Sequence, residues 1–463
     1  MAYLALLVVY SAAQIALGLW IGRRVRTSTD FFVAGRRLGP GLIFSTMLAA
    51  NIGAGSTVGA TALGYRDGLA GVWWVGSAAL GSLALALWIG PAIRRVAAEH
   101  DFHTVGAFLE FRYGVTVRTA IAALLWVGAL FILAGQLIAI ATILNAIVGV
   151  PTAAGCAVGG LLITIYFTAG GLLTSAWVNV VQLTVKLAGF ALALPLALAA
   201  AGGWDTVRAM QPTADYWNLW QGGRSGLIYL AMLGPAFVAS PGLLQKIYGA
   251  RDDRAVRLGV GANALGLALY AMVPIVMGMI ARLRFPDLES PQLALPTLLL
   301  HGVPAVVGGI GLAAVFSAEL SAADAVLFML TTSLSQDFYK RFVNAGASDG
   351  EVLRITRITA VIAGALGVLV AIIAEDVVDA LSIFYTLMAV GLFVPILAGL
   401  FTRRPSPGGA LAAIVTGVLI VGGLQVATGD ARIAGFTPAM LGLVGAFGAY
   451  AGVAGLRRRV DNS

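Results

Sequence analysis

The side chains that could do chemistry in this sequence are those that interrupt apolar stretches. Glu319, Ser321 and Asp324 lie close together in FSAELSAADAVLFML, which otherwise reads as a membrane helix. Lys186 lies in a second apolar stretch. Each charge costs roughly 2.5–3.5 kcal/mol in a bilayer even on the mild insertion scale, so these groups need a partner, water or a bound cation. The pattern therefore indicates either cation handling or buried charge pairing.

Helical spacing limits which of these groups can meet. At about 100° per residue, Ser321 and Asp324 lie roughly 60° apart and share a face, whereas Glu319 is about 140° from Asp324. If Asn179 lies level with Asp324, Lys186 is about 10 Å further from the cytoplasm, and Glu319 about 7.5 Å further. Two arrangements stay open: Lys186 reaches Asp324 beside an ion site, or it pairs with Glu319 at the edge of a cavity. In a third interpretation, a buried ion pair only fixes helix register.

The elements that must position these groups are membrane helices. The 463 residues are 59% hydrophobic and only 11% charged, and the mean hydropathy is +0.93. A soluble domain has roughly a quarter charged residues. The composition therefore predicts an all-α integral membrane protein, with a single membrane domain over residues 1–463. No nucleophile–base set, metal cluster or phosphate loop is present in the sequence, so we do not expect an enzyme.

Thirteen apolar stretches are long enough to cross a hydrocarbon core, which needs about 20 residues per helix. They predict helices at about 2–21, 42–65, 71–93, 119–148, 153–170, 175–200, 225–245, 257–281, 303–334, 353–374, 378–401, 408–427 and 436–456.

The net charge of +8 is distributed as in a membrane protein rather than as a nucleic-acid-binding face. Lys and Arg concentrate in alternate connections between the apolar stretches, including one basic group that contains Lys246 and follows the stretch at 225–245. Because basic loops stay in the cytoplasm, the N-terminus is predicted outside and the C-terminus in the cytoplasm of an inner (cell) membrane.

Two of the predicted helices carry breaks. The helix at 42–65 contains AANIGAGSTVGATALG, and the helix at 225–245 contains LGPAFVASPG. Proline removes a helical hydrogen bond, and unwound backbone at membrane depth is tolerated where it lines a cavity or is buried in protein. The two helices are five apart, so they run in opposite directions. Interrupted helices at matching positions point to a binding site at the midplane.

Four segments give the chain a resemblance to the sodium/solute symporter family: DFFVAGRRLGPGL, TAGGLLTSAWVNVVQ, SPGLLQKIYGARDDRAVRLG and SLSQDFYKRF. The resemblance implies a leucine-transporter-like fold, in which ten helices form a five-plus-five inverted repeat with two broken helices. It places this core at 40–402, one extra helix at 1–25 and two further helices at 403–463, giving 13 transmembrane helices.

The resemblance also implies a Na⁺ site between the first broken helix and the helix at 303–334. Its ligands would be the carbonyl oxygens of Ala49, Ile52 and Ala318 and the hydroxyl of Ser321. Na⁺ is a hard cation that prefers such oxygens. Ala322 stands where the family has a second hydroxyl, which weakens this site unless water or a carboxylate takes its place.

Other positions depart from the family pattern. Asn179 replaces an Asp that contributes to a second Na⁺ site in some members, and Asp324 stands where a hydroxyl is expected. Lys186 has no counterpart in that pattern. We therefore expect Asp324 beside the ion site and treat Lys186, Glu319 and Asn179 as candidates for coupling. An ammonium near the ion site could replace Na⁺ electrostatically, and a desolvated lysine can lose its proton, so H⁺ is an alternative to Na⁺.

The implied solute site lies between the broken helices and includes Asn51, Ser56, Gln136 and Ser240. The prediction is a secondary active transporter that couples Na⁺ to the symport of a small polar organic solute by alternating access. A carboxylate is favoured because Lys186 and half-helix N-termini attract anions. One alternative is a proton-coupled or cation-independent transporter that uses Lys186 and Asp324 in place of sodium. Another is a non-transporting solute sensor. The expected partners are the solute and membrane lipid, and the oligomeric state stays open.

Overall fold

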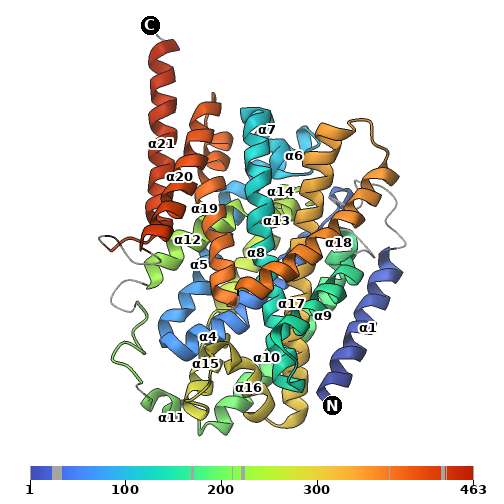
Figure 1. Cartoon of the computed structure of the whole chain (residues 1–463), viewed down its shortest axis with the longest axis vertical. Helices are drawn as coiled ribbons and strands as arrows, with labels where there is room; N and C mark the ends of the chain where they lie inside the picture. Colours follow the sequence, from blue (N-terminus) through green and yellow to red (C-terminus); the bar gives the residue numbers. More distant parts are fainter. Residues whose placement is uncertain are drawn as a thin grey trace.

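The computed structural model is nearly all helical, and its helices form one bundle (Figure 1). It describes residues 2–22, 34–167, 172–210, 212–220, 225–374, 376–428, 433 and 435–461. α6 (Gly90–Glu99) and α7 (Val105–Tyr113) lie at the end of the bundle from which the C-terminus projects. α11 (Trp204–Ala209) and α16 (Ala294–His301) lie at the opposite end, where the N-terminus is found. The predicted all-α membrane fold is confirmed.

The remaining elements follow one another along the chain with short connections. Those of the first half are α1 (Ala2–Gly22), η1 (Ala34–Arg36), α3 (Pro40–Asn51), η2 (Ala54–Ser56), α4 (Val58–Asp67), η3 (Gly68–Gly71), α5 (Val72–Ala84), η4 (Leu85–Ile89), α8 (Val115–Val148), α9 (Thr152–Phe167) and α10 (Leu172–Ala200). Those of the second half are α12 (Ser225–Ala239), α13 (Pro241–Tyr248), α14 (Asp253–Tyr270), α15 (Met272–Arg284), η5 (Pro291–Leu293), α17 (Ala305–Thr332), η6 (Ser333–Val343), α18 (Asp349–Ala374), α19 (Val377–Phe401), α20 (Pro407–Thr428) and α21 (Pro438–Asp461).

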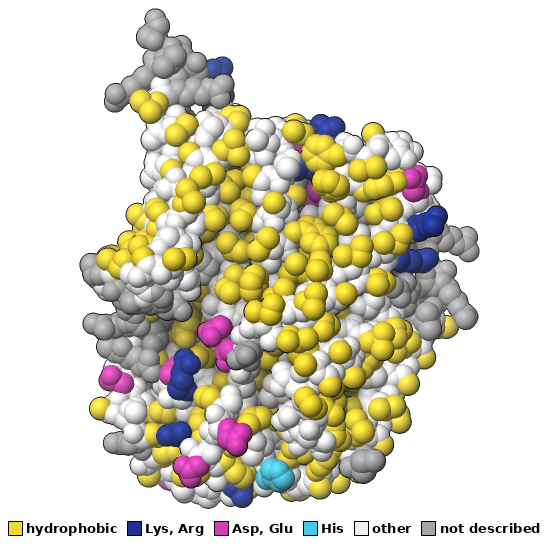
Figure 2. Space-filling view, viewed as in Figure 1, with side chains coloured by type: hydrophobic (Ala, Val, Ile, Leu, Met, Phe, Trp, Pro, Cys, Tyr) yellow, Lys and Arg dark blue, Asp and Glu magenta, His cyan; other side chains and the backbone are white. Residues whose placement is uncertain are grey.

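The length and surface of these helices suit a membrane. Within the described residues, ten helical stretches are long and apolar enough to cross one, and two shorter apolar helices cover Ala2–Gly18 and Thr152–Ile165. Figure 2 shows hydrophobic side chains over most of one face, with acidic and basic side chains gathered towards its two ends. The chain is an integral membrane protein, and the count of thirteen helices stays a prediction.

The first predicted break lies between α3 and α4. Ile52 leaves the helical conformation at φ −87° and ψ 86°, and Gly53 is extended at φ −138° and ψ −161° before the single turn of η2. A side chain cannot be accommodated at this point, because a Cβ on Gly53 would lie 2.4 Å from the Ala322 Cβ and 2.8 Å from Gln136 Oε1. Glycine therefore lets the broken backbone approach both α17 and α8.

The second predicted break lies between α12 and α13. Ser240 leaves the helix at ψ 117°, because the residue before a proline disfavours the α conformation. Pro241 then opens α13, where its missing N–H costs nothing. The Ser240 carbonyl accepts the first hydrogen bonds of α13, from Leu243 N at 3.1 Å and Leu244 N at 2.9 Å. Both predicted breaks are confirmed.

Helix packing brings the two breaks to one region. α10 packs against α3 and α17, while α8 packs against α17, α18 and α19. α17 contacts both α3 and α13, so the helix that carries Glu319 and Asp324 lies between the breaks. The described helices thus gather every predicted site residue around one centre.

Candidate functional site

The first break frees two backbone carbonyl groups. In an unbroken helix, the Gly53 N–H would donate to the carbonyl of Ala49. Here it donates to Ser56 Oγ instead, at 3.1 Å. Ile52 ends α3, so its carbonyl is also outside the regular helical ladder. These are two of the oxygens expected to bind Na⁺.

An ammonium group occupies the position facing these carbonyls. Lys186 Nζ donates to the Ala49 carbonyl oxygen at 2.5 Å and to the Ile52 carbonyl oxygen at 3.1 Å. The Lys186 side chain comes from α10 and is completely buried. Lys186 therefore contacts the ion-site carbonyls directly, an arrangement that neither of the two predicted pairings described.

The α17 side of the same region offers few oxygen atoms. Ala318 and Ser321 are both completely buried on this helix. The Ser321 hydroxyl donates to Asn179 Oδ1 at 2.8 Å, and Asn179 Nδ2 in turn donates to Thr46 Oγ1 at 3.1 Å. Ala322 supplies only a methyl group. The remaining predicted hydroxyl is thus already part of a chain of hydrogen bonds between α17, α10 and α3.

Glu319 contacts the first break from its other side. Its Oε1 lies 2.7 Å from the Thr57 hydroxyl, which also lies 2.9 Å from the Gly53 carbonyl oxygen. Within the described part of the chain, Glu319 Oε2 is buried without a hydrogen-bond partner. The charges of Glu319 and Lys186 are close enough to interact. Lys186 is therefore associated with Glu319, as in the second predicted arrangement.

Asp324 is associated with a different lysine. Its charge interacts with that of Lys246 on α13, and both side chains are buried, at 5% and 4% exposure. Lys246 Nζ also donates to the Gly242 carbonyl oxygen at 3.3 Å. Assigning Lys246 to a cytoplasmic loop was wrong, because α13 continues after Pro241 as a buried helix to Tyr248. The unbroken buried run after the proline is the signal that could have placed it.

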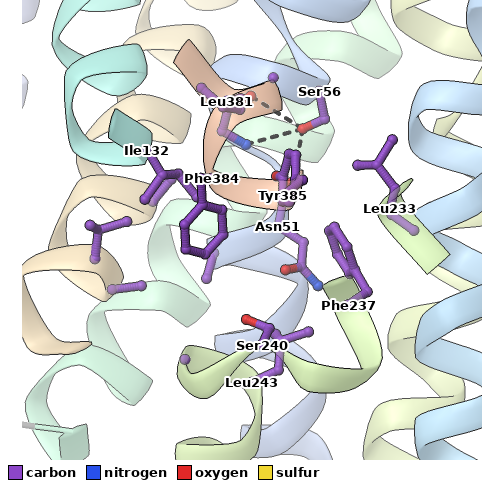
Figure 3. A pocket seen from close by; sticks show the side chains of 18 of the residues that line it. Asn51, Ser56, Ile132, Leu233, Phe237, Ser240, Leu243, Leu381, Phe384 and Tyr385 are labelled. Carbon is purple, nitrogen blue, oxygen red and sulfur yellow. Dashed lines mark hydrogen bonds between the residues drawn. The ribbon is translucent and has the colours of Figure 1, made fainter. Parts of the chain in front are cut away.

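A central cavity of about 800 Å³ lies between the two breaks. All four candidate solute-binding residues line it: Asn51, Ser56, Gln136 and Ser240. Lys246 lines it as well, whereas Lys186 is absent from its lining. Figure 3 shows Asn51 and Ser240 pointing into the same space. The structure brings the candidates together, so their individual bonds decide which of them are available to a solute.

Two of the four candidates have structural tasks already. Gln136 Oε1 accepts from the Ala54 N–H at 2.9 Å, and Gln136 Nε2 donates to the Ile132 carbonyl at 3.3 Å. The Ser56 hydroxyl accepts from Gly53 N and lies 2.8 Å from the Asn51 carbonyl oxygen. Both side chains therefore hold the shape of the first break.

Asn51 and Ser240 are better placed to meet a solute. Asn51 Nδ2 donates to Asn263 Oδ1 at 3.1 Å, and Asn263 Nδ2 donates to Ser82 Oγ at 3.3 Å. This chain of bonds orients the Asn51 amide and leaves its carbonyl oxygen towards the cavity. Ser240 sits at the second break, where its backbone carbonyl starts α13.

Aromatic side chains form much of the cavity wall. Tyr385 lies at the centre of the group, with ring centroids 5.9 Å from Trp74, 5.7 Å from Phe237 and 5.4 Å from Phe384. These rings come from α5, α12 and α19. Figure 3 shows Phe384 on one side of the space and Phe237 on the other. A mostly apolar wall with a few polar groups is typical of small-molecule sites.

An ion-pair network lies at the end of the bundle next to α7. Arg118 contacts Asp337 Oδ1 at 2.8 Å and Glu110 Oε2 at 2.5 Å, and Arg341 contacts Glu110 Oε1 at 2.8 Å. Burial raises the pKa of Glu110, but hydrogen bonds from Arg118 and Arg341 outweigh it and hold that pKa below its ordinary value. The network ties α7 and α8 to η6 and closes this end of the bundle.

The fold and the cavity define the class of protein as a membrane transporter with a leucine-transporter-like fold. The chain belongs to the sodium:solute symporter family, whose sequence model matches residues 31–417. It is similar to the high-affinity proline transporter PutP of Bacillus subtilis (25% identical; 88% of this chain and 89% of the relative). It is also similar to a sodium/glucose cotransporter of Vibrio parahaemolyticus (25% identical; 89% and 82%). A solved Na⁺-coupled sialic acid symporter has the same fold, with a TM-score of 0.85, 20% identity and 98% of each chain covered.

Proposed function

We propose that this chain is a secondary transporter that carries a small organic solute across the membrane by alternating access, and is not an enzyme. The observation that carries the proposal is the central cavity, which both broken helices line through Asn51, Ser56 and Ser240. Broken helices from two inverted halves place backbone groups at the midplane, where the two halves can rock around a bound solute. Membership of a family whose relatives include proline and glucose transporters supports the same conclusion.

The cavity supports a carboxylate with an apolar body as the solute class. Lys246 is a buried cation in the lining, and Trp74, Phe237 and Tyr385 supply a flat apolar wall. The sequence argument attributed the attraction for anions to Lys186. Lys246 now takes that role, because it lines the cavity while Lys186 contacts the carbonyls behind it.

Family membership supports Na⁺ as the coupling cation. A second candidate is coupling to H⁺, or transport without a cation, with Lys186 and Asp324 acting in place of sodium. The hydrogen bonds of Lys186 to Ala49 and Ile52 favour this second candidate. The distribution of Lys and Arg supports an inner (cell) membrane location with the N-terminus outside and the C-terminus in the cytoplasm.

The experiment is uptake into proteoliposomes that contain the purified full chain. Labelled carboxylates, amino acids and sugars are supplied under an imposed Na⁺ gradient, and separately under a pH gradient in Na⁺-free buffer. We expect uptake of a carboxylate, and exchange of internal against external solute when no gradient is imposed. Val426→Ala is the control variant, because this side chain is 91% exposed on α20. Saturable solute binding without uptake or exchange would contradict transport and favour the sensor.

A further inference from the structure

We propose that the Lys186 ammonium is a tethered cation that fills the family's Na⁺ position in this chain, so that no Na⁺ binds between the first break and α17. The inference rests on the proposed function only for its purpose, since occupancy of the position can be measured without a solute. If Na⁺ drives this transporter, it binds elsewhere in the chain.

The first argument is position. A lysine ammonium has three N–H donors and no acceptor. Lys186 uses two of them on Ala49 and Ile52, the carbonyls that the broken helix releases. The amine thus meets these oxygens as a dissociable cation would, but it is attached to α10 and cannot diffuse away. A second cation in the same cage would be repelled at short range by the first.

The second argument is the shortage of other ligands. Ala322 contributes no oxygen, and a methyl group there packs against the Gly53 backbone. The Ser321 hydroxyl directs its hydrogen to Asn179, which is held by Thr46. The residues present therefore suit an ammonium that needs acceptors on one side better than Na⁺, which needs oxygens all around it.

The third argument is charge compensation. A fixed ammonium in the membrane requires a fixed negative charge nearby. Glu319 is completely buried on α17, interacts with the Lys186 charge and reaches the same break through Thr57. A site built for exchangeable Na⁺ from carbonyls and hydroxyls needs no such carboxylate. One permanent cation explains why Lys186 and Glu319 occur together.

The consequence concerns the solute site. The cation at this position joins α3 to its neighbours and orients the break that carries Asn51 and Ser56 into the cavity. With a tethered cation, the break is ordered before any ion binds. The geometry therefore predicts a solute site that is complete without Na⁺ at this position.

The test is equilibrium binding of ²²Na⁺ to the purified full chain, compared with the variants Ser321→Ala, Lys186→Ala/Ala322→Ser and Lys246→Ala. We expect no wild-type ²²Na⁺ binding that Ser321→Ala weakens. Lys186→Ala/Ala322→Ser vacates the carbonyls and restores the second hydroxyl, so it should gain at least tenfold in saturable ²²Na⁺ binding. Lys246→Ala removes the other buried lysine and should gain none.

Two results would overturn the proposal. One is saturable ²²Na⁺ binding by the wild type that Ser321→Ala weakens tenfold or more. The other is no gain in a well-folded Lys186→Ala/Ala322→Ser variant. Because removing Lys186 leaves Glu319 without its cation, the triple variant Lys186→Ala/Glu319→Gln/Ala322→Ser repeats the test with that charge removed. A failure of the proposed function would instead appear as absent solute uptake, with these ²²Na⁺ results unchanged.

Discussion

The two broken helices solve the same backbone problem in opposite ways. At the first break, side chains from α8 and α10 satisfy the exposed groups: Gln136 accepts from Ala54 N, and Lys186 donates to the Ala49 and Ile52 carbonyls. At the second break, the chain satisfies itself, because the Ser240 carbonyl begins α13 directly. The first break is therefore a rigid, internally bonded cage, and the second leaves its side chains to the cavity.

The two buried lysines follow the same division. Lys186 lies behind the first break and is absent from the cavity lining, while Lys246 lies one helical turn beyond the second break and lines it. Each has an acidic neighbour on α17, Glu319 for Lys186 and Asp324 for Lys246. We infer from this difference that the first break handles the cation position and the second handles the solute.

The largest expected effect concerns Lys246 and the solute. Lys246→Gln should weaken binding of a carboxylate by roughly 10- to 150-fold, because a hydrogen bond to a charged group contributes about 1.5–3 kcal/mol. The measurement is the dissociation constant of the transported carboxylate and of its neutral amide. Lys340→Gln in η6 is the matched control, since Lys340 is outside the cavity lining. An equal loss for the carboxylate and the amide would show that Lys246 does not recognise charge.

The next prediction tests the close packing of the first break. Gly53→Ala should lower the free energy of unfolding by about 1–3 kcal/mol, because overpacking at a tight contact costs that much. The added Cβ would lie 2.4 Å from the Ala322 Cβ, and that methyl group cannot rotate away. Gly423→Ala on α20 is the control, since a Cβ there meets nothing within 4 Å. Unfolding in detergent measures both, and equal stability of the two variants would contradict a tight first break.

A third prediction concerns the side chain that supports η2. Gln136→Leu should lower the free energy of unfolding by about 1–3 kcal/mol, because it leaves the buried Ala54 N–H without an acceptor. Gln182 is a matched control: it is also buried, and its amide atoms have no hydrogen-bond partner in the described structure. Gln182→Leu should be neutral or stabilising. If both variants lose the same stability, Gln136 has no special part in holding the break.

Much of this architecture could be predicted from the sequence, because membrane helices and their breaks leave strong local signals. Apolar stretches revealed the helices, and the Gly-rich and Pro-containing segments revealed both breaks. Lys246 was missed because a basic residue after a proline looks like the start of a cytoplasmic loop. Whether α13 continues as a buried helix depends on packing against α17 and α3, which helical periodicity does not contain.

The contacts of Lys186 were beyond the sequence for a related reason. Depth along regular helices allowed Glu319 or Asp324 as its partner. The amine instead donates to Ala49 and Ile52, whose carbonyls are exposed by the altered backbone at Gly53. The rotation of a chain through such a break is set by long-range contacts, so periodicity on either side of it cannot give the direction of a side chain across it.

The smallest expected effect sharpens the contrast at the second break. Ser240→Ala should weaken solute binding by roughly 2- to 10-fold, because a neutral hydrogen bond contributes about 0.5–1.5 kcal/mol. It should leave stability unchanged, since the backbone carbonyl of residue 240, not the hydroxyl, starts α13. Ser56→Ala, at the first break, should do the reverse by removing the acceptor for Gly53 N and lowering the unfolding temperature. Measuring both properties in both variants separates the two roles, and a Ser240→Ala protein that loses stability but binds solute normally would remove the distinction between the breaks.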